Sequence, residues 1–365
     1  MIYLDSAATT PIRKEVLKEM IPFLTTKYGN PNSVYELGRD SRMAIDEARE
    51  RVASSINANP RNIVFTSGGS EANNIVLRGF NRDVTYKYAN EHTSSNKAAD
   101  AYGNLIVNLS ADDWIASNLH QNNDSELLEL VWYMYVNNET GKKNPVHEIG
   151  SICSGNPLSA FGTDCVQALG FEKIDVEEIK CDFMTLSSHK IHGPKGVGAL
   201  YVRDRDLINP LILGGANQEF GLRGGTENVA GIVGFGKACE IATKNLDENR
   251  ERILYLRNLF IRNLDGIRYI INCNDESKIL SIQLPGIDSE TFVVAMSTMG
   301  TAISSGSACK NGESKANEAL IAMGLNHDQA MNTVRFSFME SLLEDEVINA
   351  AMQCKQVIKM LTGGN

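Results

Sequence analysis

The chain has 365 residues, of which 42% are hydrophobic, and a formal net charge of −10 at pH 7. This length exceeds that of one ordinary domain, so we expect one large and one small domain with a sizeable core. The acidic balance argues against direct binding to nucleic acid, and against an acidic membrane surface as the main partner.

Seven cysteines are widely spaced along the chain and form no CxxC pair. An odd number at such spacing is typical of reduced thiols in a cytosolic protein and argues against a disulfide framework. The N-terminal MIYLDSAATT lacks the basic and apolar regions of a signal peptide, and no apolar run of about 18 residues predicts a membrane span. We therefore expect a cytoplasmic protein whose cysteines are mostly inert core residues.

Helical periodicity begins after Thr10 and Pro11, which we interpret as an N-cap followed by proline at the first helical position. An amphipathic helix over 43–56 follows, and short apolar runs then alternate with a helix that follows the turn at 68–71 and runs through Leu77, and with a helix over 146–153. The predicted strands are 63–66, 84–89, 105–109, 130–136, 159–163, 183–186 and 197–202. This alternation predicts an α/β fold with a mainly parallel sheet covered on both faces.

A long helical stretch over 230–264 is expected to connect this sheet to a second part of the chain. The predicted elements beyond it are strands at 279–284, 301–303 and 333–337, and helices at 289–299, 315–323 and 344–361. These elements form a smaller α+β unit. We expect a large domain over 13–245 and a small domain over 246–365 together with residues 1–12.

Lys190 lies in the polar turn SSHKIHGPKG, between two predicted strands of the stretch 181–202. A lysine near apolar surface and other cations loses part of its proton affinity, and the free amine can form imines with carbonyls. The alternative is a solvated lysine in a glycine-containing loop. His189 and His192 form an HxxH pattern, but no third metal ligand follows at a familiar spacing, so we expect no metal site.

The turn TSGGSE at 66–71 lies between a predicted strand and a helix. Its paired glycines, Gly68 and Gly69, let backbone amides approach an anion, and a helix N-terminus adds partial positive charge. The alternative is a tight turn in which Ser70 is the N-cap. No GxGxxG or Walker pattern occurs, which disfavours a dinucleotide or ATP.

Further polar groups follow other predicted strands at the edge of the sheet where ligands bind. Asp164 could keep a pyridinium nitrogen protonated and Gln167 could contact a phenolic oxygen, or both could cap the next helix. Asn138 lies in VNNETG after the apolar run LVWYMYV, and His92 follows another strand. A lone histidine is more often structural than catalytic.

Cys309 lies in SSGSACKNGES, a small, polar, glycine-containing stretch over 304–314. We expect an exposed, mobile loop whose thiol is a nucleophile, with Lys310 favouring the thiolate. The alternative is an unreactive surface cysteine. Arg335 is a lone cation in the apolar strand TVRFS, and no acid nearby in the sequence is an obvious partner, so a substrate carboxylate is a candidate.

Together these stretches resemble the cysteine desulfurases of the NifS/IscS type, which are pyridoxal-phosphate enzymes of the class V aminotransferase, fold type I group. The resemblance covers nearly the whole chain and depends on several motifs in the family's order. The motifs are YLDSAATTP near the start, YGNPNS at 28–33, FTSGGSEANN at 65–74, EH at 91–92, VNNETG at 136–141, TDCVQALG at 163–170, SSHKIHGPKGVGALYV at 187–202, LRGGTENVAGIVG at 222–234, SSGSAC at 304–309 and VRFS at 334–337.

The resemblance implies a large domain with a mainly parallel sheet, a smaller α+β domain and a bound pyridoxal 5′-phosphate. Lys190 would carry the cofactor imine, Asp164 would pair with the ring nitrogen, Gln167 with the ring oxygen, and His92 would stack on the ring. The remaining implied cofactor contacts, mostly to the phosphate, are Gly69, Ser70, Asn138, Ser187, His189 and Thr226. Thr226 would reach the site of a partner subunit, which implies an obligate homodimer.

The implied reaction takes L-cysteine to L-alanine and leaves a persulfide on Cys309, which a protein acceptor or scaffold then receives. Asn138 and Arg335 would hold the substrate carboxylate, Lys190 would act as the base, and His92 would relay a proton from the substrate thiol. Iron–sulfur cluster assembly, tRNA thiolation and DNA phosphorothioation are all served by enzymes of this type, so the acceptor stays open.

Several departures from the family pattern bear on this interpretation. Ser70 stands where the family often has threonine, and residues 93–130 are fewer than usual. The segment after the cysteine, KNGESKAN, lacks the usual proline, and VRFS is followed by FMESLLEDE where the family commonly has a small residue and a helix-capping threonine. The C-terminal tail is also short, which leaves the identity of the sulfur acceptor open. The alternatives are a selenocysteine lyase or another class V aminotransferase, and a cofactor-binding interaction protein without activity of its own.

Overall fold

The computed structural model describes residues 1–118, 126–215, 218–310 and 313–363. It has two compact units, one formed by 10–136 and 144–245, the other by 1–9, 137–143 and 246–365. The second unit therefore includes 137–143, which the sequence analysis assigned to the large domain. Among the described residues, no helix is both long and apolar enough to cross a membrane.

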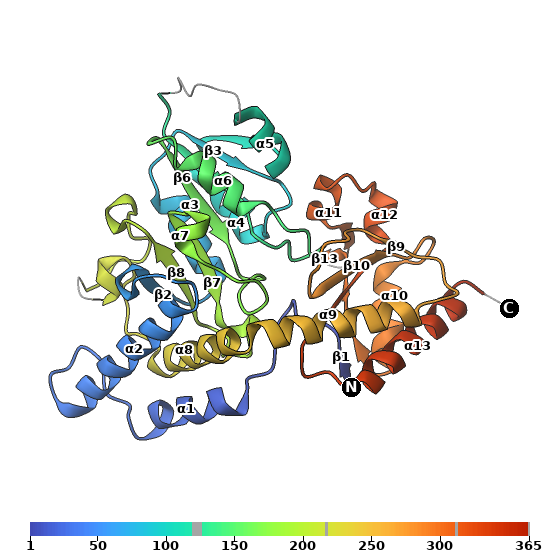
Figure 1. Cartoon of the computed structure of the whole chain (residues 1–365), viewed down its shortest axis with the longest axis horizontal. Helices are drawn as coiled ribbons and strands as arrows, with labels where there is room; N and C mark the ends of the chain where they lie inside the picture. The colour runs from blue at the N-terminus through green and yellow to red at the C-terminus, as the bar shows by residue number, and fades with distance from the viewer. Residues whose placement is uncertain (119–125, 216–217, 311–312, 364–365) are drawn as a thin grey trace. The chain divides into compact units, whose positions relative to one another are not determined.

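The larger unit is built on a seven-stranded sheet in the order β2-β8-β7-β6-β5-β3-β4 (Figure 1). Its strands are β2 Ile63–Thr66, β3 Val84–Lys87, β4 Leu105–Asn108, β5 Glu129–Trp132, β6 Ser159–Asp164, β7 Phe183–Ser187 and β8 Gly198–Val202. All neighbours are parallel except β8, which is antiparallel to both β7 and β2. The predicted mainly parallel sheet is thus confirmed, and β2, β3, β5, β6 and β7 all end at one edge.

Helices cover both faces of this sheet because successive strand residues point to opposite sides. Val64, Leu130 and Phe183 pack on one side, while Phe65 and Val131 pack on the other. The first side carries α3 Gly69–Gly79 and α4 Thr93–Tyr102. The second carries α1 Lys14–Thr25, α2 Glu36–Ser54, α5 Ala111–Asn118, α6 Val146–Cys153, α7 Val176–Ile179 and α8 Val229–Lys244.

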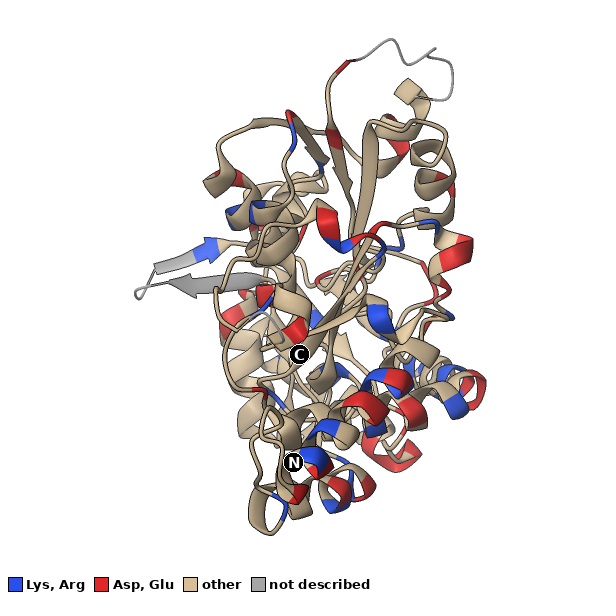
Figure 2. Cartoon of the chain, turned by 90° about the vertical axis from the view of Figure 1, so that its left-hand side faces the viewer, with Lys and Arg blue, Asp and Glu red and all other residues tan. Residues whose placement is uncertain are grey.

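Charged side chains tie the outer helices of this unit together. Arg51 on α2 pairs with Glu47 of the same helix and with Glu19 of α1, and Lys237 on α8 also pairs with Glu19. Figure 2 shows acidic and basic positions alternating along the helices in the lower part of the view. Such mixed charge adds little stability per pair because the partners are partly solvated.

The smaller unit contains an antiparallel sheet in the order β12-β15-β10-β9, and β1 pairs parallel with β11. Its strands are β1 Ile2–Tyr3, β9 Ile270–Ile271, β10 Ile279–Gln283, β11 Thr301–Ala302, β12 Ser304–Ser305, β13 Ser307–Lys310, β14 Glu313–Ala316 and β15 Thr333–Ser337. Its helices are α9 Leu246–Asn263, α10 Ser289–Thr298, α11 Glu318–Ala322, α12 His327–Met331 and α13 Glu344–Leu361.

Several local predictions differ from the structure. The helix predicted over 315–323 is instead the end of strand β14, followed by the short helix α11. Helix α1 begins at Lys14 with Arg13 as its N-cap, so the assignment of Thr10 and Pro11 to a helix start is wrong. The helix predicted over 230–264 is two helices that meet at Asn245. The stretch expected to be a loop around Cys309 contains strands β13 and β14, which pair antiparallel.

Candidate active site

The structure brings most of the predicted cofactor residues of the larger unit to the carboxyl edge of its sheet. Asp164 and Ser187 end β6 and β7, and Gly69 begins α3 directly after β2. A Cβ added to Gly69 would lie 2.8 Å from Val166 Cγ2 and 3.9 Å from Ser187 Cβ, so these three turns lie against one another. This is the edge at which open α/β sheets bind ligands.

Asp164 is held by donors on both carboxylate oxygens. Its Oδ2 accepts from Asn73 Nδ2 at 2.9 Å, and its Oδ1 accepts from the backbone N–H of Val166 at 2.9 Å. The side chain is buried, and Gln167 is buried three residues later. A carboxylate oriented in this way can pair with a protonated ring nitrogen. The residues after Asp164 form a turn and the next helix, α7, is capped by Asp175, so the alternative of a helix cap is wrong.

His92 is the N-cap of α4, and its ring is exposed. Its Nδ1 accepts from the backbone N–H of Ser94 at 3.2 Å and lies 2.7 Å from Ser94 Oγ. Asn73 Nδ2 lies 3.0 Å from the same hydroxyl, so Asn73 connects His92 to Asp164. Sequence reasoning missed Asn73 and Ser94, although each lies two or three residues from a residue that it did select.

Glu91 is a buried acid next to His92. Its Oε1 accepts from the backbone N–H of Met134 at 2.8 Å. Burial raises the pKa of Glu91 well above its ordinary value, and the Asp164 carboxylate adds to the increase while the Met134 N–H opposes it.

The Lys190 turn is held in place by the N-terminal segment of the same unit. Lys190 ends the short 3₁₀ helix η2 Ser188–Lys190. The backbone N–H and the hydroxyl of Thr10 both donate to the His189 carbonyl at 2.9 Å, and the Thr10 hydroxyl accepts from the His192 N–H at 2.8 Å. Thr10 therefore fixes the backbone on both sides of Lys190, which is the role that the structure gives it in place of a helix cap.

The same turn needs unusual backbone geometry. His192 has φ +64°, in the left-handed region, and its Nδ1 faces the Pro11 carbonyl at 3.1 Å. A Cβ on Gly193 would lie 2.0 Å from Ser188 Oγ and 3.0 Å from the Ser188 carbonyl oxygen, so a larger residue there would require the turn to shift. Among the described residues, no group of three or more histidine, cysteine or acidic side chains is arranged to hold a metal.

The N-terminus of α3 has the geometry of an anion site. Its N-cap is Gly68, at φ +149° and ψ 179°, and no side chain caps the helix, so the alternative role of Ser70 as N-cap is wrong. The Glu71 carboxylate accepts hydrogen bonds from the Ser67 backbone N–H at 2.7 Å and from Arg223 Nε at 2.9 Å. Burial would raise the pKa of Glu71, but these hydrogen bonds outweigh it and lower the pKa overall. The helix thus begins without a side-chain cap, which suits its first-turn amides to bind a phosphate.

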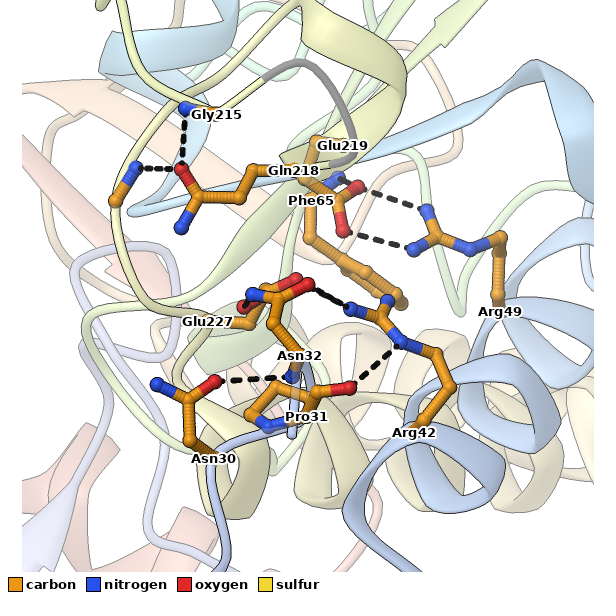
Figure 3. A network of polar contacts seen from close by, with 11 residues as sticks. Asn30, Pro31, Asn32, Arg42, Arg49, Phe65, Gly215, Gln218, Glu219 and Glu227 are labelled. Carbon is orange, nitrogen blue, oxygen red and sulfur yellow. Dashed lines mark hydrogen bonds and ion pairs between the residues drawn. The ribbon is translucent and has the colours of Figure 1, made fainter. Parts of the chain in front are cut away.

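The segment 218–228, which carries Thr226, is anchored by buried ion pairs (Figure 3). Arg49 of α2 forms two bonds with Glu219, at 2.7 and 2.8 Å, and the Phe65 N–H donates to the same carboxylate at 2.6 Å. The turn at Glu219 has φ +41°. Thr226 itself is exposed.

The next residue along the chain, Glu227, is tied to the turn that precedes α2. It accepts from Arg42 at 2.9 Å, and Asn32 Oδ1 accepts from the same guanidinium at 3.1 Å (Figure 3). Gln218 Oε1 accepts from the backbone N–H groups of Gly215 and Gly225. Thr226 is thus presented on a rigid support.

Arg335 lies on β15 of the smaller unit and is buried with two acids. It donates to Glu139 Oε1 at 3.1 Å, to Asp5 Oδ1 at 3.2 Å and to the Asn138 carbonyl at 2.8 Å. No acid near Arg335 in the sequence is its partner, as expected, and the structure supplies two that are 196 and 330 residues away. Burial disfavours the charge, but Glu139 and Asp5 raise the pKa of Arg335 overall.

Six cysteines have described side chains, and five of them are buried. Burial raises the pKa of all six thiols, to about 12 for Cys239 and Cys354, so they are poor nucleophiles as expected. The backbone of Cys309 lies in β13 opposite Ser314, whereas its side chain lies outside the described part of the structure.

The sequence model of the family described as aminotransferase class-V matches residues 2–349. This chain belongs to the class V aminotransferase family. The match spans both units, from the N-terminal strand to the last helix. As a class V aminotransferase, the protein is a pyridoxal-phosphate-dependent enzyme with the fold type I architecture.

Individual members of the family resemble the chain along almost its full length. The cysteine desulfurase IscS of Clostridium botulinum (strain Hall) is 35% identical over 377 residues, which cover 98% of this chain and 94% of that protein. Human cysteine desulfurase is 34% identical, and the match covers 99% of this chain and 82% of the human protein. A solved NifS-like protein has a TM-score of 0.88 at 30% identity, with 99% of both chains covered. The structure of SspA in complex with cysteine has a TM-score of 0.79 at 28% identity, and the match covers 94% of this chain and 100% of SspA.

The described residues fit the cofactor of this family. Asp164 supplies an oriented carboxylate, Lys190 follows a β-strand in a fixed turn, and the uncapped N-terminus of α3 supplies amides for a phosphate. These three groups meet the needs of a pyridinium nitrogen, an aldehyde and a phosphate respectively.

Proposed function

We propose that this protein is a cysteine desulfurase that converts L-cysteine to L-alanine and transfers the sulfur through a persulfide on Cys309 to a protein acceptor. The main support is the arrangement of Asp164, His92 and Lys190 at the carboxyl edge of the sheet, in a chain whose relatives are named cysteine desulfurases. The structure of SspA with cysteine, a neighbour of this fold, supports the choice of substrate.

Each group at the sheet edge has a role in this proposal. The bound cofactor supplies an electron sink for the pair released when the substrate α-proton is removed. Lys190 would hold the cofactor aldehyde, and its free amine would accept that proton. Asp164 keeps the ring nitrogen protonated, Gln167 contacts the ring oxygen, and His92 lies on the ring face. The proposed phosphate contacts are Gly69, Ser70, Ser187, His189 and Thr226.

The substrate carboxylate is held by Asn138 and Arg335. Because Arg335 already contacts Asp5 and Glu139, these acids keep its guanidinium charged and oriented, and the substrate carboxylate shares a cation that is pre-positioned. The Cys309 thiolate forms a bond to the substrate sulfur while the bond from that sulfur to the β-carbon breaks. The released carbon skeleton takes up a proton and leaves as alanine.

The proposed assembly is a homodimer in which Thr226 of each subunit serves the other subunit's site. The exposed position of Thr226 on an anchored segment supports this arrangement, since a phosphate ligand for another subunit must face outward and be held rigidly. The widely spaced cysteines favour the cytoplasm, and iron–sulfur assembly is the pathway that the IscS-named relatives suggest.

The test is to assay the purified chain, supplied with pyridoxal 5′-phosphate, for alanine and sulfide from L-cysteine with reductant. Lys190→Ala should lose the visible imine absorbance and all turnover, whereas Cys309→Ser should keep the absorbance and lose sulfide release. Turnover of selenocysteine alone, or amino transfer from alanine to a keto acid, would identify the alternative family reactions. A colourless protein that makes no alanine would refute the proposal.

A further inference from the structure

His92 has one ring nitrogen whose protonation state follows from its neighbours. Its Nδ1 accepts a hydrogen bond from the backbone N–H of Ser94 at 3.2 Å. A backbone N–H can only donate, so Nδ1 must offer a lone pair and carry no proton. In a neutral imidazole the proton is then on Nε2.

A chain of side chains enforces the same assignment from the opposite direction. Both oxygens of Asp164 accept hydrogen bonds, and Oδ2 lies 2.9 Å from the Asn73 side chain, so the amide nitrogen of Asn73 must face that carboxylate. The second N–H of this amide points to Ser94 Oγ at 3.0 Å. The Ser94 hydroxyl therefore accepts from Asn73 and has its own proton available for His92 Nδ1, 2.7 Å away.

We infer that Asn73 and Ser94 are positioning residues that set the neutral tautomer of His92, with Nδ1 as an acceptor and the proton on Nε2. The helix-capping contact alone would explain the bond from the Ser94 N–H. It would not explain why a hydroxyl, itself oriented by an amide and a carboxylate, contacts the same nitrogen.

This tautomer has a consequence for catalysis. The consequence rests on the proposed function, whereas the assignment of the tautomer is independent of it. A neutral His92 can donate a hydrogen bond from Nε2 and has no lone pair there to accept a proton. It therefore acts towards cofactor and substrate as a donor, which reverses the direction of the relay expected from the sequence. The substrate thiol must lose its proton to another group.

The direct test is nitrogen-15 NMR of the full-length, cofactor-free protein labelled at its six histidines, at a pH well above the ordinary imidazole pKa of about 6.5. His92→Gln identifies the His92 signals. We expect Nδ1 to resonate far downfield, as an unprotonated nitrogen, and Nε2 to show a bonded proton. Ser94→Ala loses the 2.7 Å hydroxyl contact and keeps only the longer backbone N–H contact at 3.2 Å, so both signals should move part of the way towards the average of a tautomer mixture, and Ser94→Thr should restore them.

Two results would overturn the inference. One is a wild-type spectrum with the proton on Nδ1 or with the averaged signals of free histidine, and it needs no variant to fold. The other is a Ser94→Ala spectrum identical to that of the wild type, which would show that Ser94 and Asn73 do not determine the tautomer of His92.

The kinetic test separates this inference from the proposed function. In the active holoenzyme, Ser94→Ala should lower kcat about ten- to a hundredfold with little change in KM, and Ser94→Thr should restore it, because a misdirected proton slows the reaction more than binding. Ser154→Ala is the matched control, since its hydroxyl donates to the Ser151 carbonyl at the exposed end of α6, far along the chain from His92. Equal kcat in Ser94→Ala and wild type would refute the catalytic consequence. If the protein has no desulfurase activity, the spectra still decide the tautomer.

Discussion

Thr10 and Asn73 hold neighbours of the residues proposed for catalysis, although neither has a reactive side chain of its own. Thr10 fixes the backbone beside Lys190, and Asn73 donates to Asp164 and lies beside Ser94. Each works through hydrogen bonds to groups buried away from water, where a lost partner costs more than the bond itself contributes. Single atoms in these side chains therefore control the geometry of the site.

Thr10→Val keeps the shape of the side chain and removes its hydroxyl. The His192 N–H loses the acceptor at 2.8 Å, so we expect the free energy of unfolding to fall by about 1–3 kcal/mol. Cofactor affinity should fall as well, because the turn that carries Lys190 loosens. Denaturant unfolding and titration with pyridoxal 5′-phosphate measure the two effects. Thr10→Ser, which keeps the hydroxyl, should behave like wild type, and equal stability of the valine variant would contradict the argument.

Glu91 gives the protein a pH dependence whose sign can be worked out. Burial raises its pKa in the folded state above the unfolded value of about 4.3, so the native chain holds a proton that the unfolded chain releases. The free energy of unfolding must therefore fall as pH rises from about 4.3 through the folded pKa. Glu91→Gln removes this contribution.

We expect the difference in unfolding free energy, wild type minus Glu91→Gln, to decrease as pH rises through that window. Urea unfolding at a series of pH values measures it, and the subtraction removes titrations common to both proteins. Glutamine keeps an oxygen for the Met134 N–H. A difference that is constant with pH would show that Glu91 is ionised in the fold.

At the scale of elements, the conformation of the segment 218–228 depends on contacts with helix α2. Glu219 and Phe220 have positive φ values without being glycine, and such strain persists only where surrounding contacts impose it. The buried Arg49–Glu219 pair supplies those contacts, and the Arg49 guanidinium also lies over the rings of Phe65 and Phe220. The position of Thr226 thus depends on an ion pair on another element.

Glu219→Gln should destabilise the protein by about 3–5 kcal/mol, because it leaves the buried Arg49 cation without its counter-charge. Glu276→Gln, which breaks the largely exposed pair with Arg250 at 2.6 Å, is the matched control and should cost about 1 kcal/mol or less. Chemical denaturation compares the two variants. Similar small losses in both would mean that Arg49 finds another partner or water.

At the scale of the whole molecule, the residues named in the proposed function are distributed over both compact units of the chain. Lys190, Asp164 and His92 belong to one unit, while Asn138, Cys309 and Arg335 belong to the other. The smaller unit also contains residues 1–9 and 137–143, so three separate stretches of sequence build it. Its β-sheet gives Arg335 its neighbours from the beginning and the middle of the chain.

Mixed dimers of Lys190→Ala and Thr226→Ala chains test the sharing of sites. If Thr226 serves the partner, each mixed dimer has one site with both defects and one intact site. Mixing equal amounts should then restore up to about a quarter of wild-type activity, since half of the dimers are mixed. If Thr226 acts within its own subunit, every site in the mixture keeps one defect, and activity should not exceed the mean of the two parents.

The motifs around Lys190, Asp164, His92 and Cys309, and the order of helices and strands, could be predicted because they depend on local patterns. Period-two apolar runs and the turns that follow them place polar groups at the ends of strands, and parallel strands bring those ends to one edge. The antiparallel pairing of the residues around Cys309 was missed, since a glycine-containing polar stretch has no clear strand period.

By itself, the sequence determined the family, the α/β fold and the chemical types of the site residues. Only the tertiary structure decided which side chains support them: Asp5 and Glu139 at Arg335, Thr10 at the lysine turn, and the Asn73–Ser94 connection to His92. The physical reason is that these contacts join residues that are distant in sequence. Their energy depends on donor directions and burial, which no local pattern of residue types records.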